Sequence, residues 1–159
     1  MRKILDFFSF VGIVGVLAGC AYAANYQPTE EERVLNEAWD FVCNVDNTFD
    51  CTGVEKPMLV LHDGVNQQAG TLGFYYPGEP IIFAIRNSND EVRRLNVVVH
   101  ELAHYLSEAK GWDAVEDSCR WEAQAFEISD KHAIYAGRPE LVRGPEWWKP
   151  YWQCQHLGE

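Results

Sequence analysis

The sequence has few basic residues, no closely spaced pair of cysteines and no long apolar run. Its 13 lysines and arginines stand against 24 aspartates and glutamates, which gives a formal net charge of −11. Such an acidic surface repels phosphates, so nucleic acid is not the expected partner. None of the five cysteines forms a Cys-x-x-Cys pair, which argues against a thiolate zinc site or a dithiol redox motif. Without an internal repeat or a low-complexity segment, the 159 residues predict one domain with a modest core.

Residues 1–19 have the layout of a secretory signal. Two basic residues precede an apolar run at 7–18, which is too short to span a bilayer comfortably. The run closes on Leu-Ala-Gly-Cys, which resembles the bacterial lipoprotein signal, and this resemblance implies that Cys20 is lipidated and followed by a tether over 20–29. Ala21, in place of Asp, resembles lipoproteins that are sent on to the outer membrane in Gram-negative bacteria. This resemblance implies a lipoprotein of the bacterial cell envelope that faces the periplasm and is anchored in the outer membrane. An ordinary cleaved signal peptide is the alternative.

The remaining four cysteines predict two disulfides. Cys43, Cys51, Cys119 and Cys154 form an even set, and the expected compartment is oxidising. Four cysteines allow three connectivities. The polar segment between the first two is short enough to close on itself, so we predict the pairs Cys43–Cys51 and Cys119–Cys154.

Periodicity and capping signals predict three main helices. Thr29 and Glu32 stand in capping-box spacing ahead of an apolar helical pattern, which predicts a helix over about 30–43. Ser88 and Glu91 form a second capping box, for a helix that ends near Lys110 with Gly111 as its stop. A third helix is expected from Asp113 and Glu116 to Gly137. The aromatic residues of the tail, Trp147, Trp148, Tyr151 and Trp152, are expected to cover the core, with a peptide-binding or membrane-facing patch as the alternative.

Three strands are expected between the first and second helices. The composition of 57–62 predicts a strand, and that of 70–85 predicts two strands joined by the turn Pro-Gly-Glu-Pro. Together they predict a small, mostly antiparallel three-stranded sheet and an α+β fold, with a single domain over 30–159.

The second helix carries the pattern His-Glu-x-x-His at residues 100–104. Residues four apart lie on the same helical face, so His100 and His104 can hold one metal ion together. Glu101 lies a step round the helix, where it can reach a water beside that ion. Two imidazole ligands with a glutamate as general base are the pattern of zinc hydrolases.

A catalytic zinc ion normally takes a third protein ligand. The metzincin continuation requires Gly and His at the positions held by Ser107 and Lys110, so that pattern is excluded. Arg-Trp-Glu-Ala-Gln-Ala-Phe at 120–126 resembles the second motif of small gluzincin metallopeptidases, which implies that Glu122 is the third ligand. Its rivals are Glu116, Asp117 and Glu127.

The order of strands, His helix and Glu helix over about 58–136 is similar to the minimal gluzincin core of the ImmA/IrrE-like metallopeptidases. The resemblance implies a zincin-like fold and zinc-dependent hydrolysis of a peptide or protein substrate. An edge strand within 70–76 could align an extended peptide by strand addition. The candidates for stabilising the oxyanion remain open: Tyr135, His132, Tyr76 and His62. A non-catalytic lipoprotein that retains a zincin fold for binding or structure is the alternative function.

Overall fold

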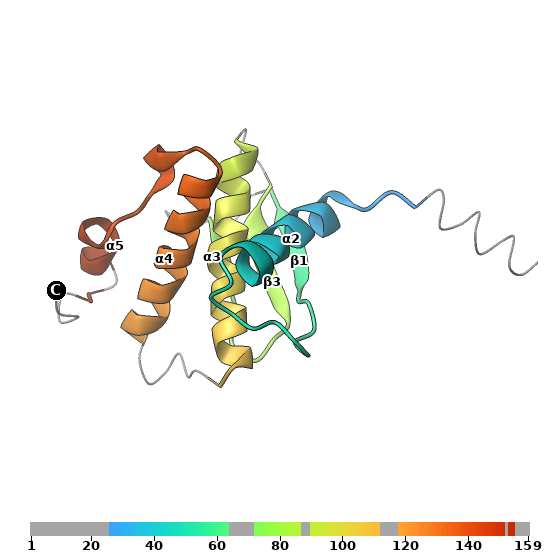
Figure 1. The fold of residues 1–159 in the computed structure, drawn as a ribbon, viewed down its shortest axis with the longest axis horizontal. Coiled ribbons are helices and arrows are strands. Elements are labelled where there is room, and N and C mark those ends of the chain that lie inside the picture. Colours follow the sequence, from blue (N-terminus) through green and yellow to red (C-terminus); the bar gives the residue numbers. More distant parts are fainter. Residues whose placement is uncertain (1–25, 64–71, 87–89, 112–117, 152, 155–159) are drawn as a thin grey trace, which may run out of the picture.

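The structure of the chain, a computed structural model, is an α+β fold in which helices cover one face of a small sheet (Figure 1). It describes residues 26–63, 72–86, 90–111, 118–151 and 153–154. The predicted signal peptide, Cys20 and the start of the tether lie outside the described residues.

The sheet has three strands in the order β1-β3-β2. The strands are β1 (Met58–His62), β2 (Gly73–Tyr75) and β3 (Ile81–Ile85). β1 pairs with β3 in parallel and β2 pairs with β3 in antiparallel orientation, so the sheet is mixed. The prediction of a mostly antiparallel sheet is therefore wrong. The chain reverses direction twice between β1 and β3, so β3 runs in the same direction as β1. β3 lies in the centre of the sheet and pairs with both other strands.

The described part of the chain also forms four α-helices. They are α2 (Glu30–Asp40), α3 (Glu91–Ala109), α4 (Ser118–Tyr135) and α5 (Pro145–Tyr151), with a π-helical extension of α2 at Phe41–Val45 and a 3-10 turn at Pro139–Leu141. In Figure 1, α3 lies against the sheet, α4 lies along the other side of α3, and α5 lies beyond α4. Among the described residues, no helix is long and apolar enough to cross a membrane.

The helix boundaries agree with the capping signals at three of the four tested ends. Thr29 and Glu32 form the predicted capping box, and Gly111 and Gly137 follow α3 and α4 with φ of 86° and 72°, the left-handed region that glycine tolerates. The predicted Ser88 cap is wrong, because α3 begins after Asp90. The carboxylate of Asp90 accepts a hydrogen bond from the Arg93 N–H at 3.0 Å and so caps the helix. The expected start of α4 at Asp113 and Glu116 lies outside the described residues.

An apolar core fixes the position of α3 between the sheet and α4. Burial alternates along β1 and β3, so every second side chain of these strands points toward α3. The apolar face of α3 packs against these side chains. Burying one Leu or Val side chain contributes roughly 1.5–3 kcal/mol, so this layer dominates the stability of the domain. Its members are Leu59, Leu61, Ile82 and Ala84 from the sheet, Val98, Val99, Leu102, Ala103 and Leu106 from α3, and Ala125 and Ile128 from α4.

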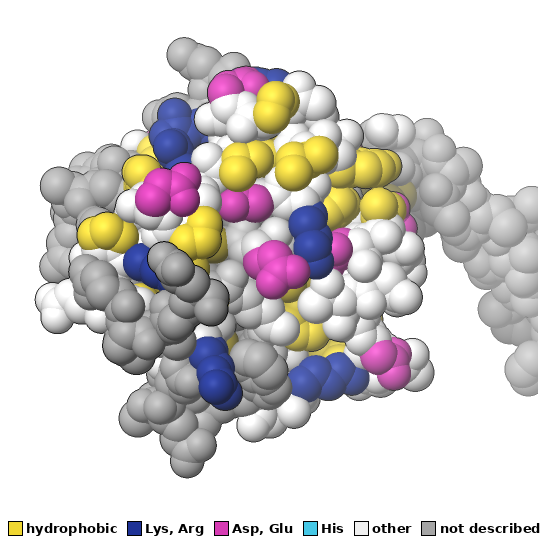
Figure 2. Space-filling model, turned by 60° about the vertical axis from the view of Figure 1, so that its left-hand side comes forward, with side chains coloured by type: hydrophobic (Ala, Val, Ile, Leu, Met, Phe, Trp, Pro, Cys, Tyr) yellow, Lys and Arg dark blue, Asp and Glu magenta, His cyan; other side chains and the backbone are white. Residues whose placement is uncertain are grey.

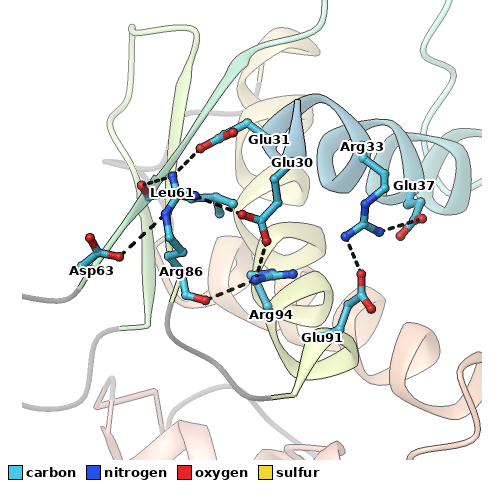
Figure 3. Close-up of polar contacts among 9 residues, drawn as sticks. All are labelled: Glu30, Glu31, Arg33, Glu37, Leu61, Asp63, Arg86, Glu91 and Arg94. Atoms are coloured by element: carbon cyan, nitrogen blue, oxygen red, sulfur yellow. Dashed lines mark hydrogen bonds and ion pairs between the residues drawn. The ribbon is translucent and has the colours of Figure 1, made fainter. Parts of the chain in front are cut away.

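Ion pairs attach the N-terminus of α2 to the sheet and to α3 (Figure 3). Arg86, just after β3, contacts Glu30 at 3.0 Å and Glu31 at 2.6 Å. Buried Arg94 of α3 contacts the other oxygen of Glu30 at 2.9 Å and donates to the Arg86 carbonyl. Since the two glutamates lie in the first turn of α2, they also complement the positive end of the helix dipole.

Both predicted disulfides are present. Cys43–Cys51 closes the loop after α2, and Cys119–Cys154 ties the C-terminal segment to the start of α4. Trp148 of α5 is buried beside this second bridge, as expected for a tail that covers the core, whereas Trp147 is half exposed. The side chains of Tyr151 and Trp152 lie outside the described residues.

Candidate metal centre

The two histidines of the His-Glu-x-x-His pattern face each other on α3. The Nε2 atoms of His100 and His104 are 3.1 Å apart, and the rings lie edge to face. One helical turn separates the two residues, as the spacing predicted. The side chain of His100 is 14% exposed and that of His104 4%. The pair is therefore nearly closed to solvent.

Glu122 of α4 completes a group of three possible ligands. Its Oε2 lies 3.4 Å from Nε2 of His100, and its Oε1 lies 3.5 Å from Nε2 of His104. One ligand atom from each of the three residues lies within 4.8 Å of the others, a spacing that could hold a metal ion. Among the rivals, Glu127 has a 66% exposed side chain paired with Lys131, while Glu116 and Asp117 lie outside the described residues.

The three side chains fit a tetrahedral cation. Ligand atoms about 2.0–2.1 Å from one ion lie about 3.3 Å apart in a tetrahedron. The two imidazole nitrogens are 3.1 Å apart, and each lies 3.4 or 3.5 Å from its nearer Glu122 oxygen, a different oxygen for each histidine. Within the described part of the chain, the buried Oε2 of Glu122 and Nδ1 of His104 have no hydrogen-bond partner. A buried carboxylate oxygen without a partner is costly, and a cation between the three residues would satisfy it.

Aromatic rings enclose the group on its α4 side. Trp121 lies against His104 with ring centroids 3.8 Å apart, and Phe126 lies against His100 at 4.5 Å. Trp148 of α5 stacks on Phe126 at 5.6 Å, so the disulfide-tied tail supports the ring that contacts the histidine. Figure 2 shows hydrophobic and charged side chains over the face that α4 and α5 present. No histidine is visible on the described part of this face.

Glu101 is buried beside the group, with 7% of its surface exposed. Burial raises the pKa of Glu101 to about 7; the Glu122 carboxylate adds to the rise, whereas His100 and a hydrogen bond from the Tyr75 N–H oppose it. A carboxylate with a pKa near neutrality is suited to accept and release a proton at physiological pH.

The environment also perturbs both histidines. Burial alone would lower the pKa of His100, but the carboxylates of Glu122 and Glu101 together raise it. The pKa of His104 is lowered well below its ordinary value by burial and by the neighbouring His100. Neutral imidazole is the form that ligates a metal, so His104 is ready for that role.

The four candidates for the oxyanion lie in other environments. His132 is buried, bonds to Asn96 at 2.9 Å and contacts Phe41, and its pKa is lowered to about 4 by burial. The exposed ring of Tyr135 also lies against Phe41. Tyr76 and His62 contact Phe74 on the face of the sheet opposite α3.

Sequence reasoning missed three residues near Glu101. Gly73 and Tyr75 of β2 lie beside Glu101, and Glu108 of α3 binds the Tyr75 hydroxyl. A Cβ on Gly73 would lie 3.0 Å from Glu101 Oε1, so the backbone of β2 approaches this carboxylate closely. An isolated glycine inside a strand pattern is the one local signal that could have indicated such an approach. β2 is an edge strand, as expected for peptide alignment, but its Tyr75 N–H is bonded to Glu101.

Comparisons of the chain with protein-family models, with curated proteins and with solved structures found no match.

Proposed function

We propose that the chain is a zinc metallopeptidase of the gluzincin type, in which His100, His104 and Glu122 hold the ion and Glu101 is the general base. One observation carries this proposal: three possible ligand groups from two helices, two of them buried and His100 nearly so, converge beside a further buried carboxylate, that of Glu101, which the ion does not need. A structural zinc site usually has four protein ligands and no general base, whereas a catalytic one keeps a position open.

The donor set suits zinc. Two imidazoles and one carboxylate are a common catalytic set for Zn²⁺. When bound there, zinc would supply Lewis acidity, which lowers the pKa of water from about 16 to about 7 and polarises a carbonyl. Glu101 would accept the proton of the attacking water and pass it to the leaving amine as the peptide bond breaks.

Matched variants on α3 and α4 test this assignment. Glu101→Gln should retain one zinc per chain and lose hydrolysis, because Glu101 acts on water and is not a ligand. Glu122→Ala should lose zinc, because it removes one of three protein ligands. Glu127→Ala is the control on the same helix, since its exposed side chain pairs with Lys131. Zinc content measured by mass spectrometry and cleavage of a broad peptide library are the readouts.

Two results contradict the proposal. Full zinc retention in Glu122→Ala would remove Glu122 from the ligand set. Unchanged hydrolysis in Glu101→Gln would remove Glu101 from its role as base.

We propose further that the domain is held at the periplasmic side of a bacterial outer membrane by lipid on Cys20. The resemblance of the first 20 residues to a lipoprotein signal supports this location, and its substrate would then be a peptide or protein of the envelope.

The burial of the ligands favours a second candidate function, a non-catalytic zinc-binding lipoprotein. His104 and Glu122 are 3% and 6% exposed, which leaves a peptide little access to the ion in this conformation. Stoichiometric zinc in the wild type without cleavage of any peptide in the library would select this second function.

A further inference from the structure

Two carboxylates of α3 hold the edge strand β2. Glu101 and Glu108 are seven residues apart, so they lie on the same face of the helix. Tyr75 contacts both: its N–H bonds to the Glu101 carboxylate, and its hydroxyl donates to Glu108 Oε2 at 2.7 Å. Gly78, in the turn after β2, donates its N–H to Glu108 Oε1 at 2.8 Å. Glu108 therefore anchors both β2 and the following turn.

The pairing of β2 explains why the Tyr75 N–H is available to Glu101. The Ile85 N–H donates to the Leu72 carbonyl at 2.9 Å, and Tyr75 stands opposite Ile82 in the same register. Hydrogen-bonded pairs alternate along antiparallel strands, so the backbone groups of Tyr75 point away from β3. Since β2 is the edge strand, this N–H would face the open edge without Glu101.

The gap between β2 and α3 is narrow at this point. A Cβ on Gly73 would lie 2.5 Å from Val97 Cγ1 and 3.0 Å from Glu101 Oε1. Only the absence of a side chain lets the strand come so near. A small shift of β2 would therefore separate the Tyr75 N–H from the carboxylate that it holds.

We propose that Glu108 is a positioning residue for Glu101: it holds the Tyr75 hydroxyl and the Gly78 N–H, and thereby fixes β2 where the Tyr75 N–H orients the Glu101 carboxylate. The proposal rests on the function assigned to Glu101 above. Glu108 touches neither the ligand group nor the water that Glu101 would deprotonate. Its effect passes through Tyr75.

Amide exchange in the metal-free protein tests the anchoring without any catalytic reaction. Tyr75→Phe removes only the hydroxyl, and Glu108→Ala removes both contacts; in each, exchange of the residue 75 amide should become roughly tenfold faster. Glu108→Gln should rescue protection, because its amide can accept from the Gly78 N–H and donate to the Tyr75 hydroxyl.

The matched control is Tyr105→Phe. Tyr105 lies on α3 beside Tyr75, with ring centroids 5.8 Å apart, but its hydroxyl donates to the Glu55 carbonyl at 2.6 Å. This variant also loses one tyrosine hydroxyl bond, yet it leaves β2 attached. Exchange of the Tyr75 amide should therefore match the wild type.

Kinetics of the zinc-loaded protein form the second arm. In Tyr75→Phe, kcat should fall roughly 10- to 100-fold with KM unchanged and zinc still at one per chain, because the base is misplaced while the ligands are intact. Unchanged amide exchange in Tyr75→Phe and Glu108→Ala would overturn the proposal, as would faster exchange with an unchanged kcat. If the wild type cleaves no peptide, the proposed function fails. The amide-exchange experiment still decides whether Glu108 holds β2 against Glu101, because it requires no catalytic activity.

Discussion

Loss of the disulfide Cys119–Cys154 should destabilise the domain more than loss of Cys43–Cys51, and only the first loss should weaken zinc binding. The two double variants, Cys119→Ser with Cys154→Ser and Cys43→Ser with Cys51→Ser, remove the same chemistry. Their bridges differ in the loop that they close, with sequence separations of 35 and 8 residues. The pair therefore provides its own control.

The expected magnitudes follow from loop closure in the unfolded chain. A loop of 35 residues corresponds to about 4 kcal/mol of stabilisation at 25 °C, and a loop of 8 residues to about 2.5 kcal/mol. The longer bridge also holds α5, whose buried Trp148 stacks on Phe126, and Phe126 contacts His100. Because Cys119 lies one helical turn before Glu122, loosening this end of α4 should reduce zinc affinity roughly tenfold.

Urea unfolding of the metal-free proteins, followed by tryptophan fluorescence, measures the stability without a contribution from bound zinc. Competition with a chromophoric chelator measures zinc affinity in the folded proteins. Equal losses of stability in the two double variants would refute the loop argument. An equal fall in zinc affinity in both would refute the specific link between the tail and the metal centre.

Three further predictions concern the base, the pH dependence and the anchor. Gly73→Ala should cost roughly 1–3 kcal/mol and lower kcat with zinc retained, because the new Cβ would overlap Val97 and Glu101; unchanged activity and an unchanged urea midpoint would contradict this. Burial lowers the pKa of His132 to about 4 in the folded chain, whereas an exposed histidine titrates near 6.5, so its contribution to stability is complete above pH 6.5 and is lost as the pH falls toward 4. Between pH 7 and pH 5 the metal-free wild type should therefore lose about 2 kcal/mol more than His132→Gln in urea unfolding, and parallel pH profiles would show that His132 is not the cause. Cys20→Ser should move the protein from the membrane fraction to the soluble fraction, and identical soluble fractionation of both would exclude the lipid anchor.

Local patterns predicted much of the fold. The capping box at Thr29 and the stops at Gly111 and Gly137 act within one turn of their own helices, so neighbours in the sequence determine them. The direction of β1 relative to β3 could not be read in this way, because it depends on which strand takes the centre of the sheet. Asp90 replaced the expected Ser88 as the cap of α3, a choice between two capping residues that sequence spacing alone did not resolve.

For the site, the sequence by itself determined that His100 and His104 share one face of a helix, since the geometry of the α-helix places residues four apart together. A resemblance suggested Glu122, but only the packing of α4 on α3 brought its carboxylate to both imidazoles and left Glu127 exposed. Tertiary structure alone also decided the surroundings of Glu101: its burial, the raised pKa and the hydrogen bond from Tyr75. These properties arise largely from contacts between segments about 20 residues apart or more, and no local spacing in the sequence specifies how closely two such segments pack.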